Sequence, residues 1–229
     1  IARHHFAKLD GITIPESLNG KYFKVKGGVL TDITSAGQSY LAGQGRNGVL
    51  VLPSSITRID NGVFKQRFQN FKAIYAEGVT EVSSFAFNET GSLNFAHLPK
   101  LKKLGEAVFT DNASLTAVNF PLLEEIGDVC FSGGANFSGN GLKITYVSIP
   151  AAKKIGSGAF HGNYKHSGVT FILGAQPEVN TKAYEDYPQE GFVAFGQLKD
   201  PILYVTPANK ATYQITDGKW HGFTVKELK

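Results

Sequence analysis

The segment LLEEIGDVCF (122–131) contains a pattern that recurs along the chain. An aliphatic residue, Ile126, is followed five positions later by a phenylalanine, Phe131. The same pair at the same spacing occurs in SITRIDNGVF (55–64), GVTEVSSFAF (78–87), KLKKLGEAVF (100–109) and AAKKIGSGAF (151–160). The five phenylalanines lie 23, 22, 22 and 29 residues apart, so the chain contains an internal repeat.

A short strand-like piece precedes each of these segments. The pieces are VLVLP (49–53), KAIYA (72–76), LNFAHLP (93–99), LTAVNFP (115–121) and ITYVSIP (144–150), and proline ends four of the five. Proline cannot donate to a strand ladder, so it marks where a strand stops. One strand and one tight turn per 22 to 29 residues predict a leucine-rich-repeat solenoid. We expect a mostly β member of the α/β class, curved, with a parallel sheet of short strands on one side and turns and short helical pieces on the other.

In such an array each coil buries its apolar residues against the same residues of the neighbouring coils. Each buried side chain contributes about 1.5–3 kcal/mol, and neighbouring strands run parallel about 4.8 Å apart. We therefore expect two core columns, one aliphatic and one aromatic. Their members are Ile59, Val82, Leu104, Ile126 and Ile155, and Phe64, Phe87, Phe109, Phe131 and Phe160.

The order aliphatic residue, Gly, two variable residues, small residue, Phe, placed after a proline-ended strand, resembles the BspA-like leucine-rich repeats of bacterial surface proteins. The resemblance covers about residues 49 to 173, and ILYVTPANKATY (202–213) and WHGF (220–223) look like that family's end cap. Val82–Ser83 departs from the pattern, and long insertions follow Phe131 and Tyr184. The resemblance implies a secreted or surface-attached protein that lacks catalytic residues and serves adhesion or protein binding.

We expect two parts in the chain. Residues 1–48 form an N-terminal cap or a divergent first coil, in which ITIPESL (12–18) and KGGVLTDI (26–33) are the strand-like pieces. Residues 49–229 form the repeat domain, and its C-terminal cap begins at about residue 199. The cap should contain a helix with Thr206 as N-cap and Pro207 at its first position, running through Tyr213. The rings expected to close the last coil are Trp220 and Phe223.

Composition excludes several classes of protein. Apolar residues make up 42% of the chain, which indicates a folded domain. No apolar run approaches the roughly 18 residues of a membrane-spanning helix. The chain begins at Ile1 and contains no Met, from which we expect a processed product without its targeting segment. The single Cys cannot form an internal disulfide.

The sequence pI near 9.0 raises the question of nucleic-acid binding. The charges that precede the core aliphatic residues change sign from coil to coil: Arg58, Glu81, Lys102 and Lys103, Glu124 and Glu125, Lys153 and Lys154. Stacked coils would place opposite charges side by side as an exposed ion ladder. Phosphate binding needs a stripe of one sign, so we expect no nucleic acid as partner.

The segment GQGRNG (43–48) has the glycine spacing of a dinucleotide-binding turn. Such a turn follows a strand and opens a helix, whereas here the strand-like VLVLP follows the glycines. We interpret the glycines as a lead-in to the first coil and expect no cofactor.

The remaining reactive side chains lack the partners that catalysis or metal binding needs. Cys130 occupies the position of Val63, Ala86, Val108 and Ala159 in the other repeats, which predicts a buried, unreactive thiol. His4, His5, His161 and His166 have no Cys or carboxylate at ligand spacing, so we expect no metal site. We expect no enzyme and no catalytic residue. Three N-x-S/T triplets, at Asn88, Asn112 and Asn136, are interpreted as turns rather than glycan acceptors.

Side chains along a strand point alternately inward and outward, so stacked strands present two columns of outward side chains. Both columns are rich in aromatic residues and poor in charge. They are Val51, Tyr75, His97, Asn119, Ser148, Leu173 and Tyr204, and Val49, Ala73, Phe95, Ala117, Tyr146, Phe171 and Ile202. An exposed apolar patch often marks an interaction surface. The candidate ligand-binding residues are Tyr75, Phe95, His97, Tyr146, Phe171 and Tyr204. Alternatively, the N-terminal 48 residues or the segment YEDYPQEGFVAFGQ (184–197) covers this face.

The function predicted from these observations is non-enzymatic recognition outside the cell or at its surface. We expect an adhesin-like monomer that binds an extracellular protein or glycoprotein. The alternative is a glycan-binding protein that supports polysaccharide capture, with Tyr75 and Tyr146 stacking on sugar rings.

Overall fold

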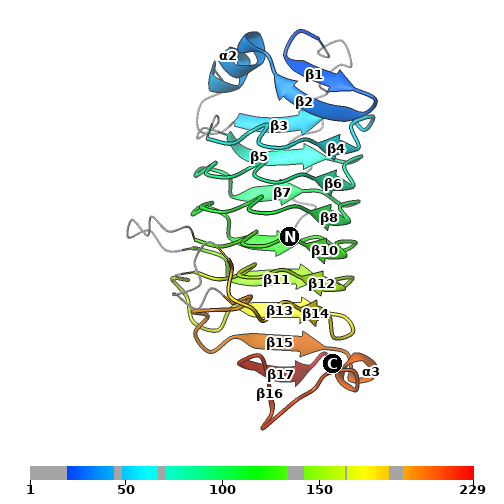
Figure 1. The fold of residues 1–229 in the computed structure, drawn as a ribbon, viewed down its shortest axis with the longest axis vertical. Coiled ribbons are helices and arrows are strands. Elements are labelled where there is room, and N and C mark those ends of the chain that lie inside the picture. The colour runs from blue at the N-terminus through cyan, green and yellow to red at the C-terminus, as the bar shows by residue number, and fades with distance from the viewer. Residues whose placement is uncertain (1–19, 44–47, 67–70, 134–141, 163, 186–192) are drawn as a thin grey trace.

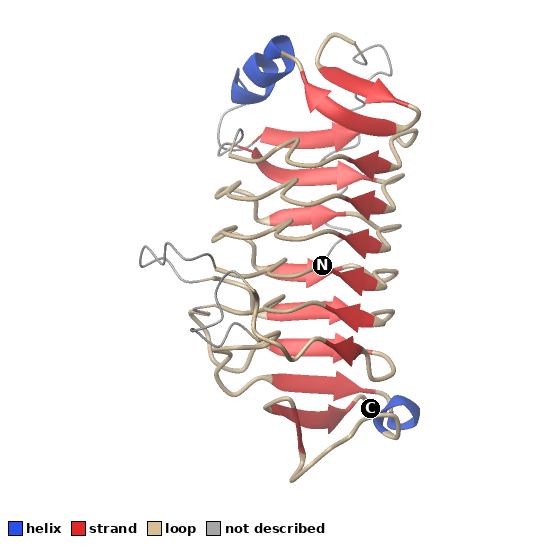
Figure 2. Ribbon diagram, viewed as in Figure 1, coloured by secondary structure: helices blue, strands red, loops and turns tan. Residues whose placement is uncertain are grey.

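The computed structural model describes residues 20–43, 48–66, 71–133, 142–162, 164–185 and 193–229. Its coils stack along the long axis of the molecule, with strands on two opposite sides of the stack (Figure 1). Among the described residues, helices lie at the two ends of the stack (Figure 2). The predicted solenoid of parallel strands is confirmed.

The long strands form two sheets. The N-terminal sheet contains β3 (Gly48–Leu52), β5 (Phe71–Ala76) and β7 (Phe95–His97). The C-terminal sheet contains β9 (Ala117–Asn119), β11 (Tyr146–Ile149), β13 (Thr170–Leu173), β15 (Ile202–Val205), β17 (Phe223–Glu227) and the antiparallel edge strand β16 (Lys219–Trp220). The sheets separate between β7 and β9, which are not paired.

The opposite side of the solenoid carries a sheet of its own, here called the ladder sheet, where the sequence analysis expected turns and short helical pieces. It consists of β1 (Phe23–Lys26), β2 (Val29–Ile33), β4 (Arg58–Ile59), β6 (Glu81–Val82), β8 (Lys103–Leu104), β10 (Glu125–Ile126), β12 (Lys154–Ile155) and β14 (Glu178–Val179). Six of these strands have only two residues, which is too short for polar–apolar alternation to reveal them.

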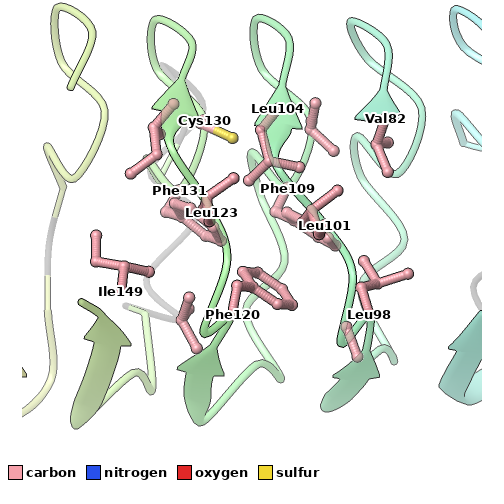
Figure 3. Close-up of a cluster of buried hydrophobic side chains, with 14 of the residues drawn as sticks. Val82, Leu98, Leu101, Leu104, Phe109, Phe120, Leu123, Cys130, Phe131 and Ile149 are labelled. Carbon is pink, nitrogen blue, oxygen red and sulfur yellow. The ribbon is translucent and has the colours of Figure 1, made fainter. Parts of the chain in front are cut away.

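Both predicted core columns are present. The aliphatic residues Ile59, Val82, Leu104, Ile126 and Ile155 pair in register from β4 to β12, and all are buried. The five rings stack nearly in parallel, with centroid distances of 4.9, 5.4, 5.4 and 5.1 Å and interplanar angles of 6°, 4°, 10° and 9°. Figure 3 shows Phe109 and Phe131 in this column, with Leu104, Leu101 and Leu123 around them.

A sixth ring, which the sequence analysis missed, extends the column. Phe195 stacks on Phe160 at 6.0 Å and 12°, and Phe160 N donates to Ala194 O at 2.7 Å as Phe131 N donates to Ala159 O. Beyond it Trp220 and Phe223 lie 5.7 and 5.0 Å from the Phe195 ring, and both are buried. The prediction that these two rings close the last coil is confirmed.

The C-terminal cap also contains the predicted helix, in shorter form. Thr206 is the N-cap of α3 (Pro207–Lys210), and its side chain accepts a hydrogen bond from Asn209 N at 3.2 Å. The prediction that the helix reaches Tyr213 was wrong. Tyr213 instead turns inward, where its hydroxyl donates to Gly174 O at 3.0 Å and its ring packs edge-on against Trp220.

At the N-terminal end, β1 and β2 form an antiparallel hairpin, and β2 pairs in parallel with β4. Leu30 of KGGVLTDI thereby joins the aliphatic column beside Ile59. The helix α2 (Ser35–Gly43) follows, and β3 begins at Gly48, as predicted for the strand after the glycines. ITIPESL, His4 and His5, and residues 44–47 of GQGRNG lie outside the described residues.

Candidate functional site

The structure places the reactive side chains in the core or apart from one another. Cys130 is fully buried, and burial raises the pKa of its thiol to about 12, so the prediction of a buried Cys is confirmed. His161 is also buried, which lowers its pKa, whereas His166 is exposed. Within the described ranges, no three His, Cys, Asp or Glu residues are grouped so that they could hold a metal ion.

Two asparagines of the N-x-S/T triplets are buried inside the turns. Asn112 is 1% exposed, its Nδ2 donates to Phe87 O at 2.8 Å, and its Oδ1 accepts from Thr90 Oγ1 at 2.5 Å. Asn88 is buried as well, and Asn136 lies outside the described residues. Burial of Asn88 and Asn112 supports the interpretation of both as turn residues.

The outer side of the ladder sheet carries the predicted alternation of charge. In register from β4 to β14 stand Arg58, Glu81, Lys103, Glu125, Lys154 and Glu178. Lys103 Nζ lies 3.8 Å from Glu125 Oε2, and Lys153 Nζ lies 2.6 Å from Glu124 Oε2. The hydrogen bond from Lys153 lowers the pKa of Glu124. A groove of about 330 Å³ follows the part of this row from β8 to β14, where the charges of Lys103 and Lys154 are balanced by those of Glu125 and Glu178.

On the N-terminal sheet the outward register agrees with the predicted columns. Tyr75 pairs with Val51 and His97, and Ala73 pairs with Phe95. Tyr75 is nevertheless only 7% exposed, with the rings of Phe95 and His97 at 5.8 and 5.4 Å, and burial raises its pKa. The expectation of an exposed Tyr75 was therefore wrong, and the Phe95 and His97 rings of β7 are among the groups packed around it.

His97 has a polar partner within the chain. The Phe95 and His97 side chains are half-buried, and His97 Nε2 lies 3.0 Å from Glu77 Oε1, which belongs to the turn after β5. Tyr75, Phe95 and His97 thus form one contiguous cluster, as the sequence register requires. Because Tyr75 lies at its centre and is buried, this cluster offers little open aromatic surface.

The C-terminal sheet differs from the predicted register at one strand. The prediction placed Phe171 and Leu173 outward, but they are 0% and 2% exposed and belong to the core. Thr170 and Ile172 take the outward positions, where they pair with Tyr146 and Ser148 of β11. The error arose because TFIL (170–173) has three consecutive apolar residues, so alternation does not reveal which of them face inward.

The outward side of this sheet is called the C-terminal face below. Its two columns are Ala117, Tyr146, Thr170, Ile202 and Thr224, and Asn119, Ser148, Ile172, Tyr204 and Lys226. Tyr146 is 37% exposed, so the folded chain does not cover it, and Tyr204 is half-buried. The six candidate residues therefore divide: three lie on the N-terminal sheet, Tyr146 and Tyr204 lie on the C-terminal face, and Phe171 is internal.

The sequence analysis missed Ile172 and Lys226 on this face. Lys226 pairs with Tyr204 across β15 and β17. The alternation in FTVKE (223–227) could have revealed this strand, but its apolar residues were assigned to the end cap. No helix in the described part of the chain has the length and hydropathy to span a membrane.

Comparisons with known proteins place this repeat architecture in a family. No curated protein matches the sequence. A similar solved structure is that of a leucine-rich repeat protein from Bacteroides ovatus ATCC 8483, which is 15% identical and aligns over 79% of this chain and 69% of that chain, with a TM-score of 0.32. The family model described as the BspA type leucine rich repeat region matches residues 42–167 with six copies, more than half of the sequence. The chain belongs to the BspA-type leucine-rich-repeat family.

Proposed function

We propose that this protein is a non-enzymatic recognition module, placed at the cell surface or outside the cell, which binds a protein or glycoprotein through its C-terminal face. The observation that carries the proposal is the composition of that face. Only one of its ten outward residues, Lys226, is charged, and Tyr146 is 37% exposed. The ladder sheet on the opposite side has a charged residue at the corresponding position of every coil from β4 to β14.

The geometry of the face suits a macromolecular partner. Five parallel strands, from β9 to β17, place their outward residues in register, and four strand spacings of about 4.8 Å span about 19 Å. Ile172 and Tyr204 are paired neighbours, and Tyr146 lies on the strand that adjoins β13. A sheet face of this kind presents a broad surface rather than an enclosed cavity. Tyrosine is a frequent anchor of protein interfaces because it combines apolar area with a polar tip.

Family membership supports the surface location and the absence of catalysis. The BspA-type repeats occupy residues 42–167 and so include β11 of the C-terminal face. Repeat arrays of this kind bind through the extended surface that their regular strands create. An adhesin-like role with an extracellular protein partner follows from the same reasoning.

Photo-crosslinking tests the proposal directly. A benzoylphenylalanine placed at Tyr146 or at Tyr204 should form covalent adducts with proteins of the host or of the growth medium. The matched control is the same probe at Lys154, an exposed residue of the ladder sheet. We expect adducts from the two face positions and few from the control. Equal yields from all three positions would contradict the proposal.

The second candidate, glycan capture, rests on the exposed ring of Tyr146. The structure weakens it in part, because Tyr75 and Trp220 are 7% and 3% exposed and cannot offer a ring face to a sugar. A glycan array distinguishes the two candidates. Saccharide-specific binding that Tyr146→Ala abolishes would favour glycan capture, whereas adducts with proteins and no glycan signal would favour the protein partner.

A further inference from the structure

The two sides of the solenoid differ in how their charges are balanced. The segments that lead into the C-terminal face carry exposed lysines, namely Lys143 before β11, Lys165 before β13 and Lys199 before β15, and Lys226 lies on the face itself. Within residues 142–146, 164–170, 198–202 and 223–227 the acidic residues are Asp200 and Glu227, and Glu227 Oε1 lies 2.9 Å from Lys210 Nζ. Four lysines against Asp200 and Glu227 give these segments a net charge of +2.

Hydrogen bonds between coils bring Lys143, Lys165 and Lys199 together along one edge of the face. Lys165 N donates to Leu142 O at 3.0 Å, which places Lys143 and Lys165 on neighbouring coils. Gly168 N donates to Lys199 O at 2.8 Å, which places Lys199 on the next coil. Coils spaced by about 4.8 Å therefore form a basic border beside the strand starts. Lys226 continues the positive charge onto the face, where it pairs with Tyr204.

In the ladder sheet acidic residues neutralise the lysines, but at this border they do not. The structure shows no ion pair between any of these four lysines and a carboxylate of the described residues, whereas Lys103 of the ladder sheet and Lys153, just before β12, each have one. Like charges on adjacent coils repel. A partner that brought carboxylates to this border would remove the repulsion and gain attraction at the same time.

We propose that the partner of the C-terminal face is a protein with an acidic docking surface. Asp and Glu side chains of the partner would face Lys143, Lys199 and Lys226, and its apolar side chains would cover Ile172 and Tyr204. The half-buried aliphatic residues favour a polypeptide over an anionic glycan, because a polyanionic sugar offers carboxylates but little aliphatic surface. The inference rests on the proposed function, and it names the chemistry of the partner.

The test uses a random copolymer of glutamate and tyrosine as the probe, because it carries both carboxylates and rings. Its binding to the immobilised protein is measured at low ionic strength and at about 0.15 M salt. The variant Lys143→Gln/Lys199→Gln/Lys226→Gln should bind about tenfold more weakly at low ionic strength, and its binding should depend less on salt. The control Lys100→Gln/Lys102→Gln/Lys154→Gln removes the same charge from exposed positions elsewhere, and its affinity should change less than about twofold.

Three results would overturn the inference. Equal loss in both triple variants would show that net charge alone attracts the copolymer. No loss in the face variant would show that the border is not used. Tighter binding of polygalacturonate than of the copolymer, lost in the face variant, would assign the border to an acidic glycan. Crosslinking from Tyr146 to proteins is independent of these measurements, so it shows separately whether the proposed function stands.

Discussion

In each of the five coils from Phe64 to Phe160, the residue two positions before the stacked phenylalanine adopts a left-handed backbone conformation. Glycine occupies this position in two coils, but the three coils between them have side chains there. The φ angles are 62° at Gly62, 60° at Phe85, 51° at Ala107, 47° at Val129 and 60° at Gly158. Such angles are strained for residues with a Cβ, and most of all for β-branched Val129.

Packing explains why the strain persists at the three central coils. Ala107 and Val129 are buried in a small apolar cluster against which Phe85 and Tyr184 pack. The Tyr184 hydroxyl donates to the Glu106 carboxylate. In these turns an unfavourable backbone angle places apolar side chains against Tyr184, a residue that follows β14, the last strand of the ladder sheet.

A pair of glycine substitutions tests whether the angle itself is costly. At Gly62 a Cβ would meet only the Lys65 Cβ, at 3.9 Å, so Gly62→Ala introduces strain without a clash. We expect it to lower the free energy of unfolding by about 1–2 kcal/mol, measured by urea denaturation. Gly91→Ala is the control, because Gly91 has no left-handed φ and a Cβ there meets nothing within 4 Å. It should be neutral or slightly stabilising. Equal effects of the two variants would contradict the strain argument.

The strands differ in how far the sequence reveals them. In β9 the sequence reveals which residue faces inward, because apolar Val118 lies between the exposed residues Ala117 and Asn119. In β13 three successive residues, 171–173, are apolar, so alternation gives no direction and the predicted face contained Phe171 in error. The burial of Tyr75 was not predictable from alternation either, because it depends on the groups that pack around the ring, among them Phe95 and His97 of the neighbouring strand.

In the ladder sheet, the pattern of charges indicated which positions of successive coils are neighbours, whereas the pattern of apolar residues did not. Two-residue strands have no measurable period, yet the sign changes from Arg58 to Lys154 already implied that these positions are neighbours. Lys103 lies between Glu81 and Glu125 in the paired register. The alternation therefore follows from the stacking of coils and lowers the repulsion that stacking would otherwise create.

Reversing one charge of the ladder should measure this effect. Lys103→Glu places three carboxylates in succession, and we expect a loss of about 1 kcal/mol in the free energy of unfolding. The loss should shrink at about 1 M salt, where the screening length falls to about 3 Å. Lys100→Glu, at an exposed position that precedes β8, makes the same change in net charge outside the ladder. A comparable loss in that control would show that net charge, not position in the ladder, is responsible.

The molecule as a whole is a one-dimensional stack in which each coil contacts its neighbours. The ring column runs through six coils, from Phe64 to Phe195, and the Trp220 ring closes it. Period alone predicted five of these rings. Phe195 was missed because it follows Phe160 by 35 residues, well beyond the repeat length, while Tyr184 occupies the expected position in sequence.

In such a stack, a core mutation should destabilise the coils next to it more than the coils far from it. Phe109 is 1% exposed and lies between Phe87 and Phe131 in the column. Phe109→Ala should lower the free energy of unfolding by about 3–5 kcal/mol, because it removes a ring from the centre of the core. Urea denaturation measures this loss, and a value below about 1 kcal/mol would contradict the stacked register.

The reaction rate of the single thiol, Cys130, shows whether the coils near a mutation open more readily than the rest. Cys130 follows on the next coil, and Phe109 N donates to Cys130 O at 2.9 Å. With its pKa raised to about 12 by burial, the thiol stays protonated near pH 8, so the native protein should react with a thiol reagent only after local or global opening. Phe109→Ala should accelerate this reaction more than Phe23→Ala does, because Phe23, equally buried, lies on β1 at the far end of the stack. Equal acceleration by both variants, at matched losses of stability, would mean that the coils open only together.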